Sequence, residues 1–185
     1  LATVREKDLV AMIAYSLRFF EGIRLMRDLI NNGEVGEPLY VHVEAGQYLP
    51  DWRPGSDYRK AYSAQSDQGG GVLLDLSHEL DYVLWIFGPV RHVSSVLRKV
   101  SSLEIDVEDT ADILMEHASG LISSVHLDYL QRATARTCKV VGSEGTLIWD
   151  YSTDCVQVYT SHSNIWQRYE YQTDRNDMYI QELEH

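Results

Sequence analysis

Cysteine and long apolar runs are scarce in this sequence. Cys138 and Cys155 are its only cysteines, and both lie in strand-like surroundings, too few for a disulfide scaffold or a zinc site. We therefore expect two reduced, buried thiols in a cytoplasmic protein. No apolar run approaches the ~20 residues that cross a bilayer, so we expect no membrane span and no membrane partner.

Positive charge is also scarce. Lys and Arg number 16 against 28 Asp and Glu, which gives a net charge of −12 with no basic cluster. Nucleic acids and anionic membranes are bound through basic surfaces, so we expect neither as a partner. The 185 residues, 44% hydrophobic and 24% charged, are typical of one globular domain. Because the first residue is Leu rather than Met, we expect residues 1–185 to be a fragment of a larger protein.

Nucleotide-binding and hydrolase motifs are missing. No Gly-x-Gly-x-x-Gly follows a strand pattern, and the glycines at 69–71 are not followed by Lys-Ser/Thr. Gly-Ser-Glu-Gly at 142–145 is typical of a hairpin turn, and there is no Gly-x-Ser-x-Gly elbow. We therefore expect no cofactor-binding residues in this chain and no cofactor bound by the chain alone.

Residues 69–88 carry the most informative pattern. Three glycines precede this stretch and Gly88-Pro89 ends it, so the sequence predicts one helix. Its apolar stripe, at ~100° per residue, consists of Leu73, Leu76, Leu80, Val83, Leu84 and Phe87. The opposite side consists of Asp75, His78, Glu79 and Tyr82, with Asp81 on its flank.

Asp75 and His78 lie one turn apart on this helix. A carboxylate and an imidazole so placed can transfer a proton, orient a sugar hydroxyl or bind a metal. The alternative is a solvated helix face that happens to carry a histidine.

Residues 48–68 show neither a helical nor a strand period. Loops of this length in compact domains are usually functional or disordered. This one holds aromatic side chains beside Arg53, Arg59 and Lys60, which suit a sugar or another small anionic polyol. The loop residues expected to bind substrate are Tyr48, Trp52, Arg53, Tyr58 and Tyr62. The alternative is a loop without function.

The rest of the chain predicts an α+β domain with an open, predominantly antiparallel sheet and helices packed on one face. Helices are expected at 19–32, 69–88 and 176–184. Strands are expected at 9–15, 39–47, 90–100, 110–117, 121–130, 135–141, 146–151, 155–160 and 166–171. Strands 110–160 carry apolar residues on both faces, which favours a homo-oligomer joined through the open sheet face.

Several of these segments resemble the Gfo/Idh/MocA oxidoreductases, which include glucose–fructose oxidoreductase and inositol dehydrogenase. The resemblance rests on Gly-Gly-Gly-Val-Leu-Leu-Asp-Leu-Ser-His-Glu-Leu-Asp-Tyr at 69–82, Tyr-Ser-Leu-Arg-Phe at 15–19 and Val-Gly-Ser-Glu-Gly-Thr at 141–146. It implies a C-terminal substrate-binding and oligomerisation domain, without the N-terminal Rossmann domain that binds NAD or NADP. Residues 47–54 are similar to members that act on sugars or sialic-acid-like compounds.

The resemblance also implies roles for individual residues. His78 would accept the proton of a substrate hydroxyl and Asp75 would orient or polarise it, with Arg18 and Tyr82 among the substrate contacts. Alone, the chain would be inactive.

Two other functions stay open at this point. One is a sugar-binding or assembly module without catalysis. The other is a metal-dependent isomerase or hydrolase that uses His42 and Glu44, which share a strand face, together with Asp75 and His78.

Overall fold

An eight-stranded sheet forms the body of the computed structural model, which describes residues 2–172, 174 and 176–185. The strands follow the order β2-β3-β4-β1-β5-β6-β7-β8. Their bounds are β1 Pro38–Gly46, β2 Val90–Arg98, β3 Thr110–His117, β4 Ile122–Asp128, β5 Ala135–Gly142, β6 Gly145–Asp150, β7 Cys155–Thr160 and β8 Trp166–Glu170. Only β1 and β4 pair in parallel; the other neighbours are antiparallel. The expected α+β fold with an open sheet is confirmed.

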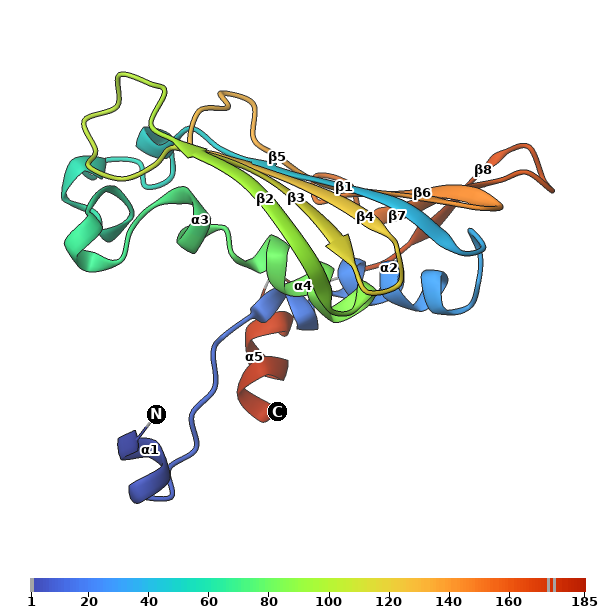
Figure 1. Ribbon diagram of the computed structural model, residues 1–185, viewed down its shortest axis with the longest axis horizontal. Coiled ribbons are helices and arrows are strands. Elements are labelled where there is room, and N and C mark those ends of the chain that lie inside the picture. The colour runs from blue at the N-terminus through green and yellow to red at the C-terminus, as the bar shows by residue number, and fades with distance from the viewer. Residues whose placement is uncertain (1, 173, 175) are drawn as a thin grey trace.

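Helices lie against one face of the sheet, below it in Figure 1. They are α2 Glu21–Asn31, α3 Val72–Asp75 and α4 His78–Phe87, with the 3-10 turn η1 Ser16–Phe19 before α2. The apolar spacing of α2 places Ile23, Met26 and Ile30 in the core. On the sheet side of the same core, the alternate β1 residues Val41 and Val43 are buried. Among the described residues, no helix covers the upper face in Figure 1.

The two ends of the chain lie on the helix side. Helix α5 Asp177–Glu184 lies beside η1. The N-terminal residues, with the short helix α1 Ala2–Glu6, lead away from the body (Figure 1).

The strand predicted at 9–15 is wrong. These residues lie outside the sheet, and Leu9, Val10 and Ile13 are 53%, 102% and 76% exposed. An uninterrupted apolar run is typical of a strand that is covered on both faces. Nothing in the described part of this chain covers it.

The single helix predicted over 69–88 is also wrong. The chain breaks at Leu76 and Ser77, where the Ser77 hydroxyl donates to the carbonyl oxygen of Leu74 at 2.8 Å. After the break, Glu79 and Tyr82 are fully buried, whereas Leu84 is 43% exposed. Glu79 and Tyr82 therefore do not share an exposed face with Asp75 and His78, although the sequence predicted that they would. That prediction assumed one continuous helix, and the break changes the direction in which the later side chains point.

Residues 48–68 form a loop of short 3-10 turns. These turns are η2 Leu49–Asp51, η3 Tyr58–Lys60, η4 Tyr62–Ala64 and η5 Ser66–Gln68. They are followed by Gly70, where an added Cβ would clash with the carbonyl oxygen of Tyr62. The glycine thus lets the loop pack closely against the start of α3.

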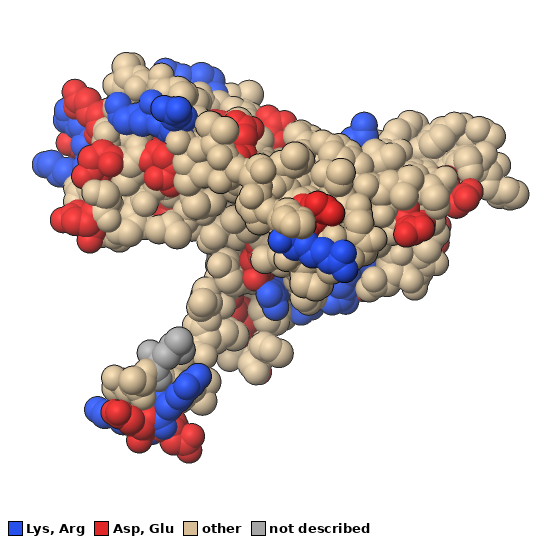
Figure 2. Space-filling view, in the orientation of Figure 1, with Lys and Arg blue, Asp and Glu red and all other residues tan. Residues whose placement is uncertain are grey.

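Cys138 and Cys155 are free and fully buried, as expected. No helix among the described residues is long and apolar enough to span a membrane. On the face seen in Figure 2, acidic and basic side chains lie interspersed at the end formed by the loops.

Candidate functional site

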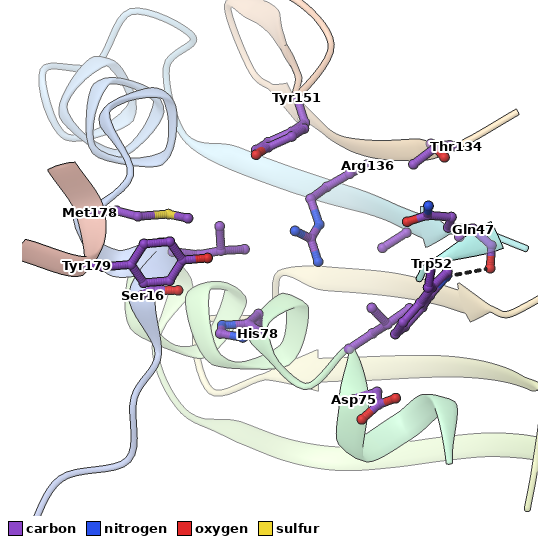
Figure 3. A pocket seen from close by; sticks show the side chains of 15 residues that line it. Ser16, Gln47, Trp52, Asp75, His78, Thr134, Arg136, Tyr151, Met178 and Tyr179 are labelled. Atoms are coloured by element: carbon purple, nitrogen blue, oxygen red, sulfur yellow. Dashed lines mark hydrogen bonds between the residues drawn. The ribbon is translucent and has the colours of Figure 1, made fainter. Parts of the chain in front are cut away.

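A pocket of about 300 Å³ opens on the helix side of the sheet, where the end of β1 and the start of β5 face α3, α4 and α5 (Figure 3). Gln47 and Trp52 lie at one end and Tyr179 of α5 at the other, with Arg136 between them. The volume is at the lower end of the range for small-molecule sites.

His78 is the first residue of α4 and lines this pocket. Its Nδ1 is buried and has no hydrogen-bond partner among the described residues, and its ring meets that of Tyr15 edge-on at 5.5 Å. Burial lowers the pKa of His78 below its ordinary value, and the positive charge of Arg136 lowers it further. The imidazole is therefore neutral at pH 7 and able to accept a proton.

Asp75 ends α3 and lines the same pocket. Its Oδ2 accepts a hydrogen bond of 2.7 Å from the hydroxyl of Tyr129, whose side chain is fully buried in the core. Burial and the neighbouring Asp75 carboxylate raise the pKa of Tyr129, so its hydroxyl stays a donor. The carboxylate is thus held in a fixed place at the pocket wall.

Arg136 is a charged pocket residue that the sequence did not reveal. It is the second residue of β5, and its Nε lies 2.8 Å from Oε1 of Glu79. Glu79 is fully buried, and burial raises the pKa of its carboxyl while Arg136 opposes that rise. A lone arginine at the start of a strand carries no motif; its partner lies far away in sequence.

Trp52 is the one residue of the predicted substrate loop that lines the pocket. Its Nε1 donates to the backbone oxygen of Gln47 at 3.1 Å, and its ring packs edge-on against Tyr129 at 5.2 Å. Both contacts fix the indole, which presents an apolar surface to the pocket (Figure 3).

The other loop residues lie elsewhere. Tyr48 is covered by Arg132, whose Cζ is 3.4 Å from the ring centroid, and Arg53 lies over Tyr62 at 5.4 Å. The Tyr58 hydroxyl accepts a hydrogen bond from the backbone nitrogen of Glu104 at 3.2 Å. Arg53 and Tyr58 line a separate cavity of about 10 Å³, which has room for no more than a water molecule.

Arg18 and Tyr82 also lie outside the pocket lining. The Arg18 guanidinium donates two hydrogen bonds of 2.7 Å to the carboxylate of Asp81. Tyr82 is fully buried between α4 and the sheet, where burial raises the pKa of its hydroxyl. The expectation that Tyr82 contacts substrate is corrected by this burial, which follows from the break in the helix.

His42 and Glu44 cannot join Asp75 and His78. Both lie on the open face of β1, where Nδ1 of His42 is 2.8 Å from the Ser124 hydroxyl, whereas the pocket lies on the helix side. Within the described residues, no group of three or more His, Cys, Asp or Glu could hold a metal ion. The geometry therefore gives no support to the metal-dependent alternative.

The chain is similar to oxidoreductases in its sequence and in its fold. Residues 23–148 match the GFO/IDH/MocA C-terminal domain. The chain is 25% identical over 176 residues to a levoglucosan dehydrogenase of Pseudarthrobacter phenanthrenivorans, covering 80% of this chain and 44% of that protein. It is 28% identical over 147 residues to a 1,5-anhydro-D-fructose reductase of Ensifer adhaerens, covering 78% and 42%.

Among solved structures, an inositol dehydrogenase homolog of Azotobacter vinelandii complexed with NAD+ superposes with a TM-score of 0.77 at 20% identity, covering 94% of this chain and 48% of that one. At this identity the likeness shows the fold alone. The chain thus spans less than half the length of each of these relatives. Because the family model matches more than half of the chain, the chain belongs to the GFO/IDH/MocA oxidoreductase family, in the part that forms its C-terminal domain.

Proposed function

We propose that this chain is the substrate-binding and oligomerisation domain of an NAD- or NADP-dependent oxidoreductase that acts on a sugar, a polyol or a sialic-acid-like compound. The observation that carries this proposal is the neutral, half-buried imidazole of His78 in a pocket of small-molecule size. Its named relatives act on sugars, which supports the substrate class.

Each pocket residue has a distinct part in the proposed reaction. When bound, the nicotinamide supplies the hydride acceptor for oxidation of a carbinol. His78 accepts the hydroxyl proton, and Asp75, held by Tyr129, accepts a hydrogen bond that orients the same or a neighbouring hydroxyl. Trp52 provides an apolar wall for the sugar ring.

The chain's own pocket fits the substrate and not a dinucleotide. Its volume of about 300 Å³ accommodates one small ligand, and the sequence has no glycine-rich strand–helix turn for phosphates. Residues of another part of the protein would therefore hold the cofactor, and this domain would present the substrate to it.

Turnover by the full-length protein tests the proposal. We expect nicotinamide reduction, followed by absorbance, with at least one member of a panel of aldoses, cyclic polyols and anhydrosugars. Binding of a sugar without turnover under any pairing with NAD+ or NADP+ would favour the non-catalytic module instead.

The isolated chain is expected not to bind NAD(H) or NADP(H) and to have no dehydrogenase activity. Titration calorimetry with millimolar nucleotide measures this directly. Full-length protein provides the positive control, and a saturable micromolar signal from the chain alone would contradict the assignment.

The open sheet face is expected to join two copies of the chain. Leu114 and Ile122 are 50% and 43% exposed there, and we expect them to be buried in an interface of more than ~1,000 Å². Light scattering at low micromolar concentration should report at least twice the chain mass. Leu114→Glu should lower that mass to the monomer's, whereas Leu183→Glu, on an exposed position of α5, should not. A wild-type monomer would rule out this interface.

A further inference from the structure

Arg136 occupies the centre of the pocket, and its role is not explained by proton transfer. Figure 3 shows its guanidinium projecting from β5 into the space between Tyr151 and His78. The Arg136 Cζ lies 5.8 Å from the centroid of the Tyr151 ring. The side chain therefore reaches the place where a substrate would lie.

The Arg136 guanidinium is held from one side only. Its Nε lies 2.8 Å from Oε1 of the fully buried Glu79, an ion pair without hydrogen-bond alignment. Neither terminal nitrogen of Arg136 has an acceptor among the described residues. A guanidinium that is paired at Nε leaves these nitrogens as a planar pair of donors, the geometry that binds a carboxylate through two parallel hydrogen bonds.

Two other arginines are already paired with carboxylates. Arg18 is engaged by Asp81, and Arg59 by Asp57 and Glu104 at 2.8 and 2.6 Å. Arg53 lies over the Tyr62 ring, and neither Arg53, Arg59 nor Lys60 of the loop at 48–68 is among the residues that line the pocket. Arg136 is the arginine among its lining residues.

The charges in the pocket are separated in space. Arg136 lies at its centre, while the carboxylate of Asp75 lies apart from it, below Trp52 in Figure 3, and is bonded to Tyr129. His78, which lines the same pocket, is neutral. Such a pocket offers an acceptor for a hydroxyl at one point and a fork of donors for an anionic group at another.

We propose that Arg136 binds the carboxylate of the substrate, which is therefore an acidic sugar or polyol of monosaccharide size. This assignment rests on the proposed function, because it specifies the substrate class of the same pocket. Glu79 is a positioning residue: it holds the Arg136 side chain without touching the substrate. Neutral sugars lack the group that would pair with the two terminal nitrogens.

Matched pairs of probes test the proposal. Dissociation constants for D-glucuronate against D-glucose, and D-gluconate against sorbitol, are measured by calorimetry on the full-length protein in the presence of NADH. We expect at least one acidic member to bind at least about tenfold more tightly than its neutral counterpart, as two charge-assisted hydrogen bonds would provide.

Substitutions of Arg136 then test whether this residue causes the tighter binding of the acidic probe. Arg136→Gln should weaken binding of the acidic probe by about 10- to 100-fold and leave the neutral probe unchanged. Glu79→Gln combined with Arg136→Gln avoids an uncompensated buried carboxylate and should show the same loss, so a folding defect cannot account for it. Arg168→Gln, on β8 away from the pocket, is the matched control.

The outcomes separate the two proposals. Equal binding within both pairs, no binding of either acidic probe, or a preference that survives both Arg136 variants would overturn the role of Arg136. Turnover of neutral sugars alone would do the same while supporting the oxidoreductase. Tight acidic-probe binding lost in both variants, with no turnover of any panel member, would support Arg136 and contradict the oxidoreductase.

Discussion

Replacing His78 with Asn is expected to lower kcat of the full-length enzyme by roughly 10²- to 10⁴-fold, which is the usual contribution of a positioned acid–base group. Asn preserves approximate size and polarity but cannot accept the substrate proton. Cofactor affinity and the thermal midpoint should stay unchanged, because His78 is the first residue of α4 and its Nδ1 bonds to nothing in the described residues. Steady-state kinetics and thermal melts measure both quantities.

The pH dependence gives a second measure of the same residue. Burial and Arg136 place the folded pKa of His78 below the ordinary 6.5, so the imidazole stays neutral further into acid. The rate constant kcat/KM should therefore fall only as pH drops through that lowered value. Arg136→Gln removes the positive charge and should move this fall in kcat/KM to a higher pH. Asp75→Asn should cost less in kcat than His78→Asn. Near-wild-type kcat in the His78 variant would show that another group accepts the proton.

Replacing Trp149 with Ala is expected to lower the free energy of unfolding strongly. The indole is fully buried, and its ring lies 6.0 Å from Phe20 and 6.2 Å from Tyr151. Its Nε1 also donates to the Tyr171 hydroxyl at 3.2 Å. Truncation of such a residue removes about 3–5 kcal/mol of unfolding free energy, which lowers the midpoint by roughly 6–20 °C in a chain of this size.

Trp166 provides the matched control for that measurement. It is 48% exposed on the edge strand β8, so Trp166→Ala should change the unfolding free energy by less than about 1 kcal/mol. Chemical denaturation followed by circular dichroism compares the two variants. Equal losses would mean that the sheet edge contributes as much to stability as the core does.

The sequence predicted the sheet well, because its strands are short and bounded by turn residues. The strands at 110–117 and 155–160 were located to the residue, and six others within two residues at each end, whereas no strand forms at 9–15. Alternation of apolar and polar side chains is a local property, so it survives without knowledge of the fold.

Two kinds of feature could not be predicted. The helix breaks at Leu76 and Ser77, where the sequence has neither Gly nor Pro, and the burial of Glu79 and Tyr82 after the break is a tertiary feature. The pairing of Glu79 with Arg136 joins α4 to β5, and pairs of this kind have no signal in a single sequence. The candidate site was therefore foreseen at Trp52, Asp75 and His78 but not at the guanidinium between them.

The exposed segment at 9–15 has a practical consequence for handling the isolated chain. Leu-Val-Ala-Met-Ile-Ala-Tyr contains seven residues without a charge or a proline, rich in side chains that favour extended pairing. Short segments of this composition, left uncovered, stack into intermolecular cross-β assemblies. The isolated chain is therefore prone to aggregate from this end, and a lysine placed at Val10 would act as a gatekeeper that keeps it dispersed.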